Sequence, residues 1–192
     1  MLTPVGRAAR GGGTLPGTGR KRQKVGAGDF RRLRWGMTRA EVLALEPEWC
    51  VDGIHTAGNE ELLAIPFRVS TEFGDHGLAA IRYRLRGTLG PQSGYWSAIE
   101  ELGQALAAEL GPAELEGAIL SHDASVWGGP EGRAAAMTGY AAWVKQWSVG
   151  GRTRVRLALQ RGMEDVDKMQ PLVIKLSYTA LPSVMPRGGA KP

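Results

Sequence analysis

Hydrophobic and polar residues alternate in two stretches of the chain, and a glycine-containing turn interrupts each stretch. In the first, residues 67–73 and 81–86 flank the turn Gly74-Asp75-His76-Gly77. In the second, residues 143–149 and 153–159 flank Gly150-Gly151. A period of two is typical of half-buried strands, so each stretch predicts a β-hairpin, and Leu172 to Tyr178 predicts one more strand.

Two other segments have a helical period. Thr38 and Glu41 have the spacing of a capping box, and Pro47 ends the segment that they open. In the second segment the apolar residues Tyr95, Ile99, Leu102, Leu106 and Leu110 fall on one helical stripe. Gly111-Pro112 follows them and supplies a stop signal. These patterns predict a short helix over 39–46 and a longer one over 95–110.

The order of these elements predicts an α+β fold. Hairpin connections and one-sided alternation favour an antiparallel sheet of four to six strands, made of two hairpins plus the final strand, with two helices packed on one face. We expect a single domain over 29–181, which could consist of two similar helix-plus-hairpin halves, 29–90 and 91–181. Residues 1–28 and 182–192 are predicted to be disordered tails.

The positive charge of the chain is concentrated in the first tail. The 192 residues contain 24 Lys and Arg against 19 Asp and Glu, a net charge of +5. Residues 1–28 hold six basic residues and no acidic ones, so 18 basic and 19 acidic residues remain and the body has a net charge of −1. The tail is interpreted as a solvated leader, or as residues added by a start codon placed too early. The alternative is an arm that attracts nucleic acid or an acidic membrane.

Several classes of protein are excluded or disfavoured. No stretch reaches the roughly 18 apolar residues of a membrane span, and the tail lacks the apolar core of a secretory signal. We therefore expect a cytoplasmic location, or a periplasmic one only if the start is misassigned. The single Cys50 cannot form an internal disulfide, so the fold depends on its hydrophobic core.

Two short segments carry a resemblance to known proteins. The first is Leu33-x-Trp35-Gly36-Met37-Thr38-x-x-Glu41-Val42. The second consists of Trp147, a glycine-containing turn and the strand Thr153-Arg154-Val155-x-Leu157. They resemble small bacterial α+β proteins related in fold to the β-lactamase-inhibitor and outer-membrane-assembly lipoprotein modules. The resemblance covers about 30 positions of the 192. It implies helices packed on an antiparallel sheet whose surface or loops bind another protein. The chain departs from the lipoprotein pattern because no acylatable cysteine lies near its start.

A search for catalytic and metal-binding patterns yields no site. Cys50, Asp52 and His55 would need a special loop to act together, and the residue types of a hydrolase triad in Ser121-His122-Asp123 are adjacent and so point in different directions. Carboxylates cluster at Glu60-Glu61 and at Glu164, Asp165 and Asp167, and both clusters are interpreted as solvated loops. We predict no catalytic residue, no metal and no cofactor, and therefore a protein that is not an enzyme.

The strand phases place basic residues on one face of the sheet. If the apolar alternates face the helices, the opposite face carries one acid, Glu72, and eight basic side chains: Arg68, Arg82, Arg84, Arg86, Lys145, Arg154, Arg156 and Lys175. Arginine stems often lie over an open sheet face for purely structural reasons. The functional interpretation is a docking face for an acidic protein surface or for a phosphate backbone.

Three hypotheses for the function follow. The first is a non-enzymatic protein-binding module, most concretely a bacterial immunity or inhibitor protein that neutralises a cognate toxin by occlusion. The second is a nucleic-acid-binding protein that uses the tail and the basic face, although Tyr83, Trp143 and Trp147 alternate onto the apolar face, away from the basic residues. The third is an envelope-associated assembly or chaperone-like factor. The partner and the oligomeric state are left open.

Overall fold

A computed structural model describes residues 30–120, 126–161 and 172–182 of the chain. It contains three helices, α1 (Arg39–Leu45), α2 (Gln92–Leu110) and α3 (Gly129–Thr138). The strands are β1 (Cys50–Asp52), β2 (His55–Leu62), β3 (Ile65–Gly74), β4 (Gly77–Leu85), β5 (Leu115–Ile119), β6 (Val126–Trp127), β7 (Ala142–Val149), β8 (Thr153–Arg161) and β9 (Leu172–Ala180). The predicted tail 1–28 lies outside the described residues, and so does the predicted tail 182–192 except for Pro182.

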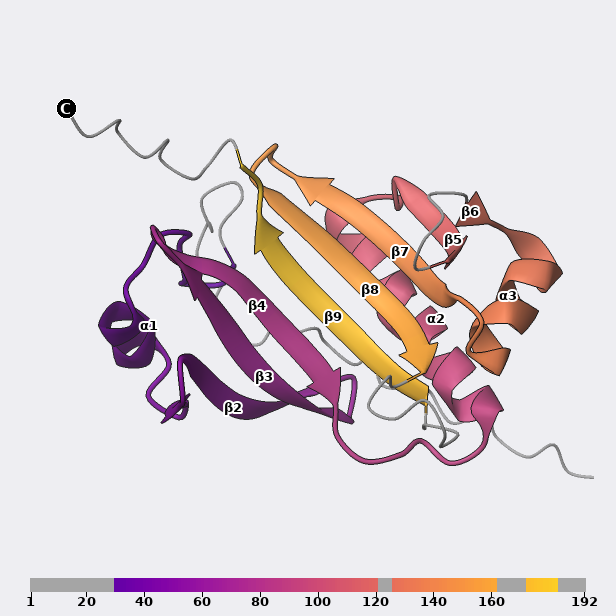
Figure 1. The fold of residues 1–192 in the computed structure, drawn as a ribbon, viewed down its shortest axis with the longest axis horizontal. Helices are drawn as coiled ribbons and strands as arrows, with labels where there is room; N and C mark the ends of the chain where they lie inside the picture. The colour runs from indigo at the N-terminus through magenta and orange to yellow at the C-terminus, as the bar shows by residue number, and fades with distance from the viewer. Residues whose placement is uncertain (1–29, 121–125, 162–171, 183–192) are drawn as a thin grey trace, which may run out of the picture.

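All nine strands form one antiparallel sheet in the order β1-β2-β3-β4-β9-β8-β7-β5-β6. The prediction of an α+β fold with an antiparallel sheet is confirmed, but the expected four to six strands and two helices are wrong. Strands β1–β4 precede α2 in the chain and β5–β9 follow it. The two sets meet at the centre of the sheet, where β4 pairs with β9 through Ile81↔Tyr178 and Arg84↔Lys175 (Figure 1).

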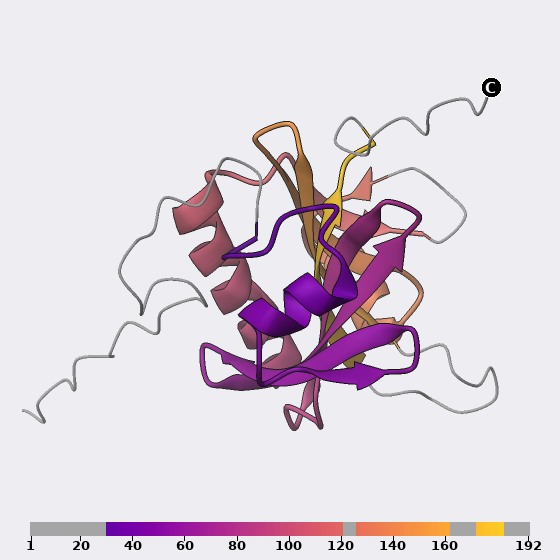
Figure 2. The same ribbon diagram turned by 90° about the vertical axis from the view of Figure 1, so that its left-hand side faces the viewer.

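Helices α2 and α3 cover one face of the sheet. Helix α2 packs on β7, β8 and β9, and α3 packs on β5, β7 and β8. Figure 2 shows strands β8 and β9 edge-on with α2 on one side of them, and the purple strands of the first set curve beneath α1. The core between these layers is apolar and includes Phe67, Tyr83, Leu102, Trp147 and Leu157. The opposite face of β3, β4, β8 and β9 is not covered by α2 or α3.

Local signals account for the elements that the sequence predicted. Thr38 and Glu41 form the capping box of α1: the Glu41 amide donates to Thr38 Oγ1, and the Thr38 amide donates to Glu41 Oε2 at 2.8 Å. Helix α2 ends before Gly111, whose φ of 89° suits glycine. Each predicted strand lies within an observed one or extends a single residue beyond it.

The sequence does not predict strand β2, and it assigns Glu60-Glu61 to a loop, because the inward positions of this strand are polar or lack a side chain. Thr56, Gly58 and Glu60 alternate toward the core, so the strand shows no apolar stripe. A residue distant in the sequence forms a hydrogen bond with, or packs against, each of these three positions. Buried Thr56 bonds to Thr71 with the two hydroxyl oxygens 2.7 Å apart, and a Cβ on Gly58 would lie 2.4 Å from Trp49 Cδ1. Residues 59–61, predicted to be a solvated loop, therefore belong to the sheet.

The turn between β2 and β3 also lacks a recognisable signal. Leu62 pairs with Ile65, so the turn consists of Leu63 and Ala64, which have φ of 53° and 61°. Two-residue hairpin turns of this kind prefer Asn-Gly or Asp-Gly, because positive φ is unfavourable for residues with a Cβ. Leu63 is nevertheless suited to the site by its packing against the core.

We expect Ala64→Gly to stabilise the protein by about 1 kcal/mol, because glycine adopts positive φ without steric conflict. Chemical denaturation followed by tryptophan fluorescence measures this change. The same replacement at exposed Ala40 in α1 is the control, since in a helix it should destabilise the protein by about 1 kcal/mol. A loss of stability in Ala64→Gly would show that the turn is not under strain at this position.

Candidate functional site: a basic face of the sheet

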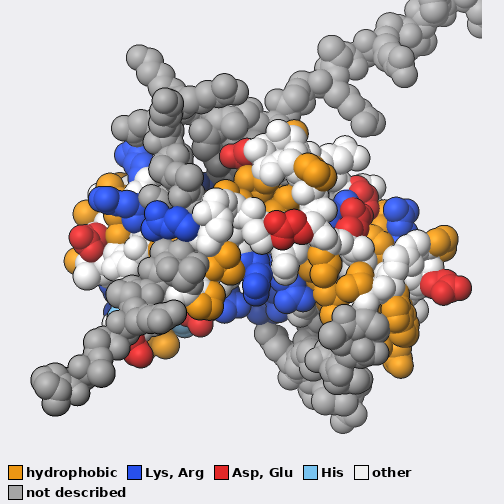
Figure 3. Space-filling view, turned by 90° about the horizontal axis from the view of Figure 1, so that it is seen from above, with side chains coloured by type: hydrophobic (Ala, Val, Ile, Leu, Met, Phe, Trp, Pro, Cys, Tyr) orange, Lys and Arg blue, Asp and Glu red, His pale blue; other side chains and the backbone are white. Residues whose placement is uncertain are grey.

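Seven of the eight predicted basic residues lie together on the face of the sheet turned away from α2 and α3. They come from β3, β4, β8 and β9, four strands that are neighbours in the sheet, with Arg86 directly after β4. All seven are exposed. We call this surface the basic face, and its members are Arg68, Arg82, Arg84, Arg86, Arg154, Arg156 and Lys175. Figure 3 shows Lys and Arg side chains gathered in the lower middle of the view, on the side of the sheet that faces the reader in Figure 1.

The strand register orders these side chains in rows across the sheet. Arg68 lies opposite Arg84, and Arg84 lies opposite Lys175, so three cations stand side by side on β3, β4 and β9. In the neighbouring row Arg82 and Arg156 lie on either side of Ser177. The sequence placed these residues on one face, but only the position of β9 between β4 and β8 joins the two hairpins into one surface.

Lys145 does not belong to the basic face, and its predicted placement there is wrong. It lies opposite Leu157 on the helix-covered face and is 7% exposed. Its Nζ is 3.0 Å from Glu100 Oε2 of α2 and 3.1 Å from Glu116 Oε1 of β5. Because Lys145 has the same strand phase as Trp143 and Trp147, the period of two already indicated an inward position. The ammonium is retained there because both carboxylates pair with it.

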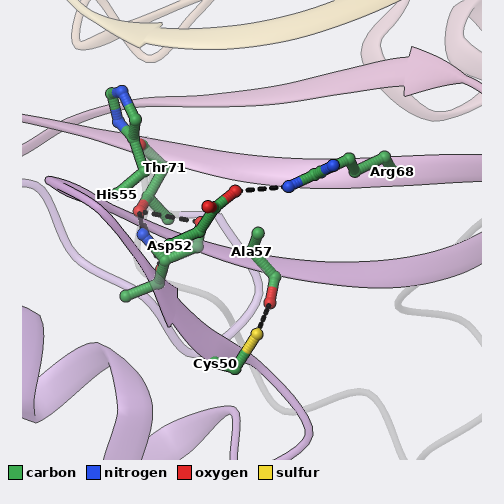
Figure 4. A network of polar contacts seen from close by, with 7 residues as sticks. Cys50, Asp52, His55, Ala57, Arg68 and Thr71 are labelled. Carbon is green, nitrogen blue, oxygen red and sulfur yellow. Dashed lines mark hydrogen bonds and ion pairs between the residues drawn. The ribbon is translucent and has the colours of Figure 1, made fainter.

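Asp52 and Glu72, two carboxylates from the described part of the chain, pair with members of the basic face. Asp52 of β1 forms an ion pair with Arg68, and Glu72 of β3 pairs with Arg82, whose Nε donates to Glu72 Oε2 at 2.9 Å. Figure 4 shows Arg68 reaching across to Asp52. All four side chains are about half exposed, so these pairs are surface pairs. Asp52 could not be assigned to this face in advance because β1 has only three residues and no alternating pattern.

The residues that resembled a cysteine-dependent site do not form one. The Cys50 thiol donates to the carbonyl oxygen of Ala57 at 3.5 Å, whereas His55 Nδ1 lies 2.6 Å from the carbonyl oxygen of Thr71 (Figure 4). Asp52 pairs with Arg68 rather than with His55. The described part of the chain contains no group of three or more His, Cys, Asp or Glu side chains that could hold a metal ion. Ser121-His122-Asp123 and the acidic residues 164–167 lie outside it.

The chain was compared with protein-family models, curated proteins and solved structures, and none matches. The resemblance carried by residues 33–42 and 147–157 therefore stays a prediction. In the fold, the first of these segments joins distant parts of the chain. The Gly36 amide donates to the carbonyl oxygen of Leu78 at 3.0 Å, and Trp35 Nε1 donates to Thr153 Oγ1 of β8 at 2.8 Å.

A second polar cluster lies on the helix-covered side of the sheet. Arg31 forms a bidentate ion pair with Glu60 of β2, in which Nη1 lies 2.9 Å from Oε1, and the Tyr83 hydroxyl donates to Glu60 Oε2 at 3.2 Å. Burial raises the pKa of Tyr83 well above its ordinary 10.0 and also raises the pKa of Tyr178. Both phenols therefore favour folding fully below pH 10, and this contribution is lost as the pH rises through their raised pKa values. The cluster is a packing element, because Phe30 covers it with ring contacts to both tyrosines.

Trp96 and Trp127 differ in their surroundings. Trp96 of α2 is partly buried against Trp143, with ring centroids 5.2 Å apart, and the Arg133 guanidinium lies 4.9 Å from the Trp96 ring. Trp127 on the edge strand β6 is 40% exposed. Neither tryptophan lies on β3, β4, β8 or β9, so neither belongs to the basic face. None of the described helices is both long and apolar enough to cross a membrane.

Proposed function

We propose that this chain is a non-enzymatic protein-binding module whose basic face docks on an acidic surface of a partner protein. One observation supports the proposal: the register of four neighbouring strands brings seven exposed basic side chains onto one sheet face. The body that carries them has a net charge near zero, so the positive charge is local. Complementary charge on a partner raises the association rate and selects against partners of like charge.

The composition of the basic face favours a protein over single-stranded nucleic acid. Proteins that bind single strands stack bases on aromatic side chains set among basic ones. The strands β3, β4, β8 and β9 carry no aromatic residue at the positions that point to the same side as the basic residues. Besides the charged side chains, these positions hold Ser, Thr, Ala, Pro, Val and Gln. Tyr83 and Phe67 face the core. The face therefore offers charge and hydrogen-bond donors but no stacking surface.

In its most concrete form, the proposed module is a bacterial immunity or inhibitor protein that occludes the functional surface of a toxin. Occlusion needs a broad, rigid surface and no chemistry, and a continuous sheet provides such a surface. The gene neighbourhood tests this form directly. A toxin-like reading frame next to this gene would favour it, whereas a cluster of outer-membrane assembly genes would favour the envelope-associated alternative.

Replacing Arg82, Arg84 and Arg156 together by alanine should abolish partner binding and leave the melting temperature within a few degrees of the wild type. The three side chains are exposed, so their removal takes little from folding while it removes the centre of the docking charge. Affinity purification with the wild-type and variant chains identifies the partner by its loss from the variant. Titration calorimetry with the purified partner then measures the affinity.

The matched control is the variant Arg32→Ala/Arg34→Ala/Arg152→Ala. It removes the same charge from exposed positions outside the four strands of the basic face. We expect it to bind the partner as the wild type does. Equal binding by both triple variants would contradict the proposal, and an equal loss in both would show that only the overall charge matters. If the species lost from the basic-face variant is a nucleic acid, the proposed partner class is wrong.

A further inference from the structure

Ser177 lies between two arginines on the basic face. It is directly opposite Arg82 of β4 and directly opposite Arg156 of β8, and β9 is the strand between these two. Neighbouring strands lie about 4.8 Å apart, which puts the two arginine backbones about 10 Å apart. A long arginine side chain spans half of that distance, so both guanidinium groups can meet a single ligand above the short serine.

The donors of these three residues are accessible from outside the molecule. Arg82 and Arg156 are exposed, and Ser177 is partly exposed. Arg82 uses Nε and Nη2 in its surface pair with Glu72, which leaves its Nη1 group out of that pair. The Ser177 hydroxyl donates to the carbonyl oxygen of Arg156 at 3.5 Å, a weak hydrogen bond that it can exchange for a stronger one to an anion. The three residues therefore offer two guanidinium groups with a hydroxyl donor between them.

The charge around Ser177 suits a dianion. Arg154 lies diagonally across from Ser177, two residues before Arg156 on β8. The three arginines and the paired Glu72 contribute three positive charges and one negative, a sum of +2. A carboxylate has one charge and two oxygens, which a single guanidinium can satisfy. A phosphoryl group has about −1.5 to −2 charge and three acceptor oxygens, so it can bridge two guanidinium groups and also accept from a hydroxyl.

We propose that the basic face binds a phosphorylated serine or threonine side chain of the partner protein, with the phosphoryl group above Ser177 and between Arg82 and Arg156. This inference rests on the proposed protein-docking function. It adds the chemical class of the group that anchors the partner and the place on the face where that group lies. Docking then depends on phosphorylation of the partner, because an unmodified hydroxyl has no charge to pair with the two guanidinium groups.

Three labelled peptide mixtures test the inference with the full chain. Each has random residues on either side of one fixed position, which holds phosphoserine in the first mixture, glutamate in the second and serine in the third. Fluorescence anisotropy at physiological salt, which screens weak contacts between exposed charges, measures their affinities. We expect the phosphoserine mixture to bind at least about tenfold more tightly than the serine mixture and about fivefold more tightly than the glutamate mixture.

The decisive variant is Arg82→Lys/Arg156→Lys, which keeps both positive charges but replaces each planar guanidinium by an ammonium. Lysine cannot donate two parallel hydrogen bonds to phosphoryl oxygens, so the affinity for the phosphoserine mixture should fall at least about tenfold. The matched control Arg32→Lys/Arg152→Lys makes the same replacement at exposed positions outside the four strands and should bind as the wild type does. Ser177→Ala should bind about threefold more weakly because it lacks the central hydroxyl. Melting curves verify that each variant is folded.

Each result has a defined meaning. No preference for phosphoserine over glutamate, or wild-type affinity in Arg82→Lys/Arg156→Lys, would overturn the inference. Inorganic phosphate that competes as strongly as the phosphopeptides would also overturn it, because the site would then take the free anion. If phosphatase treatment of the lysate does not reduce partner capture, and capture still requires Arg82, Arg84 and Arg156, the proposed function stands and only the phosphoryl anchor is wrong. If a single-stranded oligonucleotide binds more tightly than the phosphoserine mixture and depends on Arg156, both the inference and the proposed function fail.

Discussion

Gly77→Ala should destabilise the protein by about 4 kcal/mol, the largest effect that we expect from a single methyl group in this chain. Gly77 opens β4 with φ of 94°, a conformation that is unfavourable for alanine. A Cβ at this position would lie 2.2 Å from the carbonyl oxygen of Gly36 and 2.7 Å from that of Met37. Both contacts are with backbone atoms, so no side-chain rotation can relieve them.

The consequences of this clash extend beyond the turn. The backbone of Gly36 and Met37 is held on β4 by hydrogen bonds to Leu78, at 3.0 Å from the Gly36 amide and 2.8 Å to the Met37 carbonyl oxygen. Separating the two segments would also displace Trp35 from Thr153 of β8. Urea denaturation followed by tryptophan fluorescence measures the loss.

Gly53→Ala is the matched control for Gly77→Ala. Gly53 also has positive φ, 59°, but a Cβ there would meet nothing within 4 Å. We expect this variant to lose about 1 kcal/mol, the cost of the backbone conformation alone. Similar losses in the two variants would show that the contact between Gly77 and residues 36–37 does not hold the N-terminal segment on the sheet.

Glu60→Gln should destabilise the protein by about 3 kcal/mol, because it leaves the Arg31 guanidinium without a balancing charge in a largely buried position. The Arg31 and Glu60 side chains are only 18% and 14% exposed, so water cannot replace the lost partner fully. The glutamine is nearly isosteric with glutamate, and its amide oxygen can still accept the hydrogen bond from the Tyr83 hydroxyl. The loss therefore reports the charge rather than a cavity, and thermal and urea denaturation measure it.

The triple variant Arg31→Met/Glu60→Leu/Tyr83→Phe separates the ion pair from its surroundings. It removes both charges and the phenol hydroxyl together while keeping apolar bulk. Apolar replacements of complete buried ion pairs are often neutral or stabilising, so we expect this variant to lose less than half as much as Glu60→Gln. A larger loss in the triple variant would mean that the polar cluster itself provides net stability. A negligible loss in Glu60→Gln would show that Arg31 is adequately solvated.

The elements predicted from the sequence are those whose signals are local. The capping box of Thr38 and Glu41, the stripe of α2 and the alternation in β3, β4, β7 and β8 depend on residues a few positions apart. Side-chain direction along a single strand or helix follows from backbone geometry, so these patterns survive without knowledge of the rest of the fold. The same geometry placed seven basic residues on one face. The same geometry places Lys145 inside, because Lys145 shares the strand phase of Trp143.

The elements missed were those stabilised by distant residues. Strand β2 has inward polar positions that Arg31 and Thr71 satisfy from elsewhere in the chain. Its hairpin turns through Leu63 and Ala64 without a glycine, and β1 and β6 are too short to show a period. Strand β5, five residues long with Gly117 at its centre, shows no clear alternation either. The four missed strands account for the wrong number. Helix α3, rich in glycine and alanine, likewise has no strong apolar stripe and is held by packing on β5, β7 and β8.

The sequence by itself determined which basic side chains of β3, β4, β8 and β9 point away from the core, because alternation is a property of each strand alone. It could not determine which strands are neighbours. The pairing of β4 with β9 sets Arg84 beside Lys175 although they are far apart in the chain, and it adds the charge of the final strand to those of the first hairpin. Likewise, only the folded chain brings Asp52 to Arg68 and buries Lys145 between two glutamates. Strand order depends on long-range packing, which no local pattern encodes.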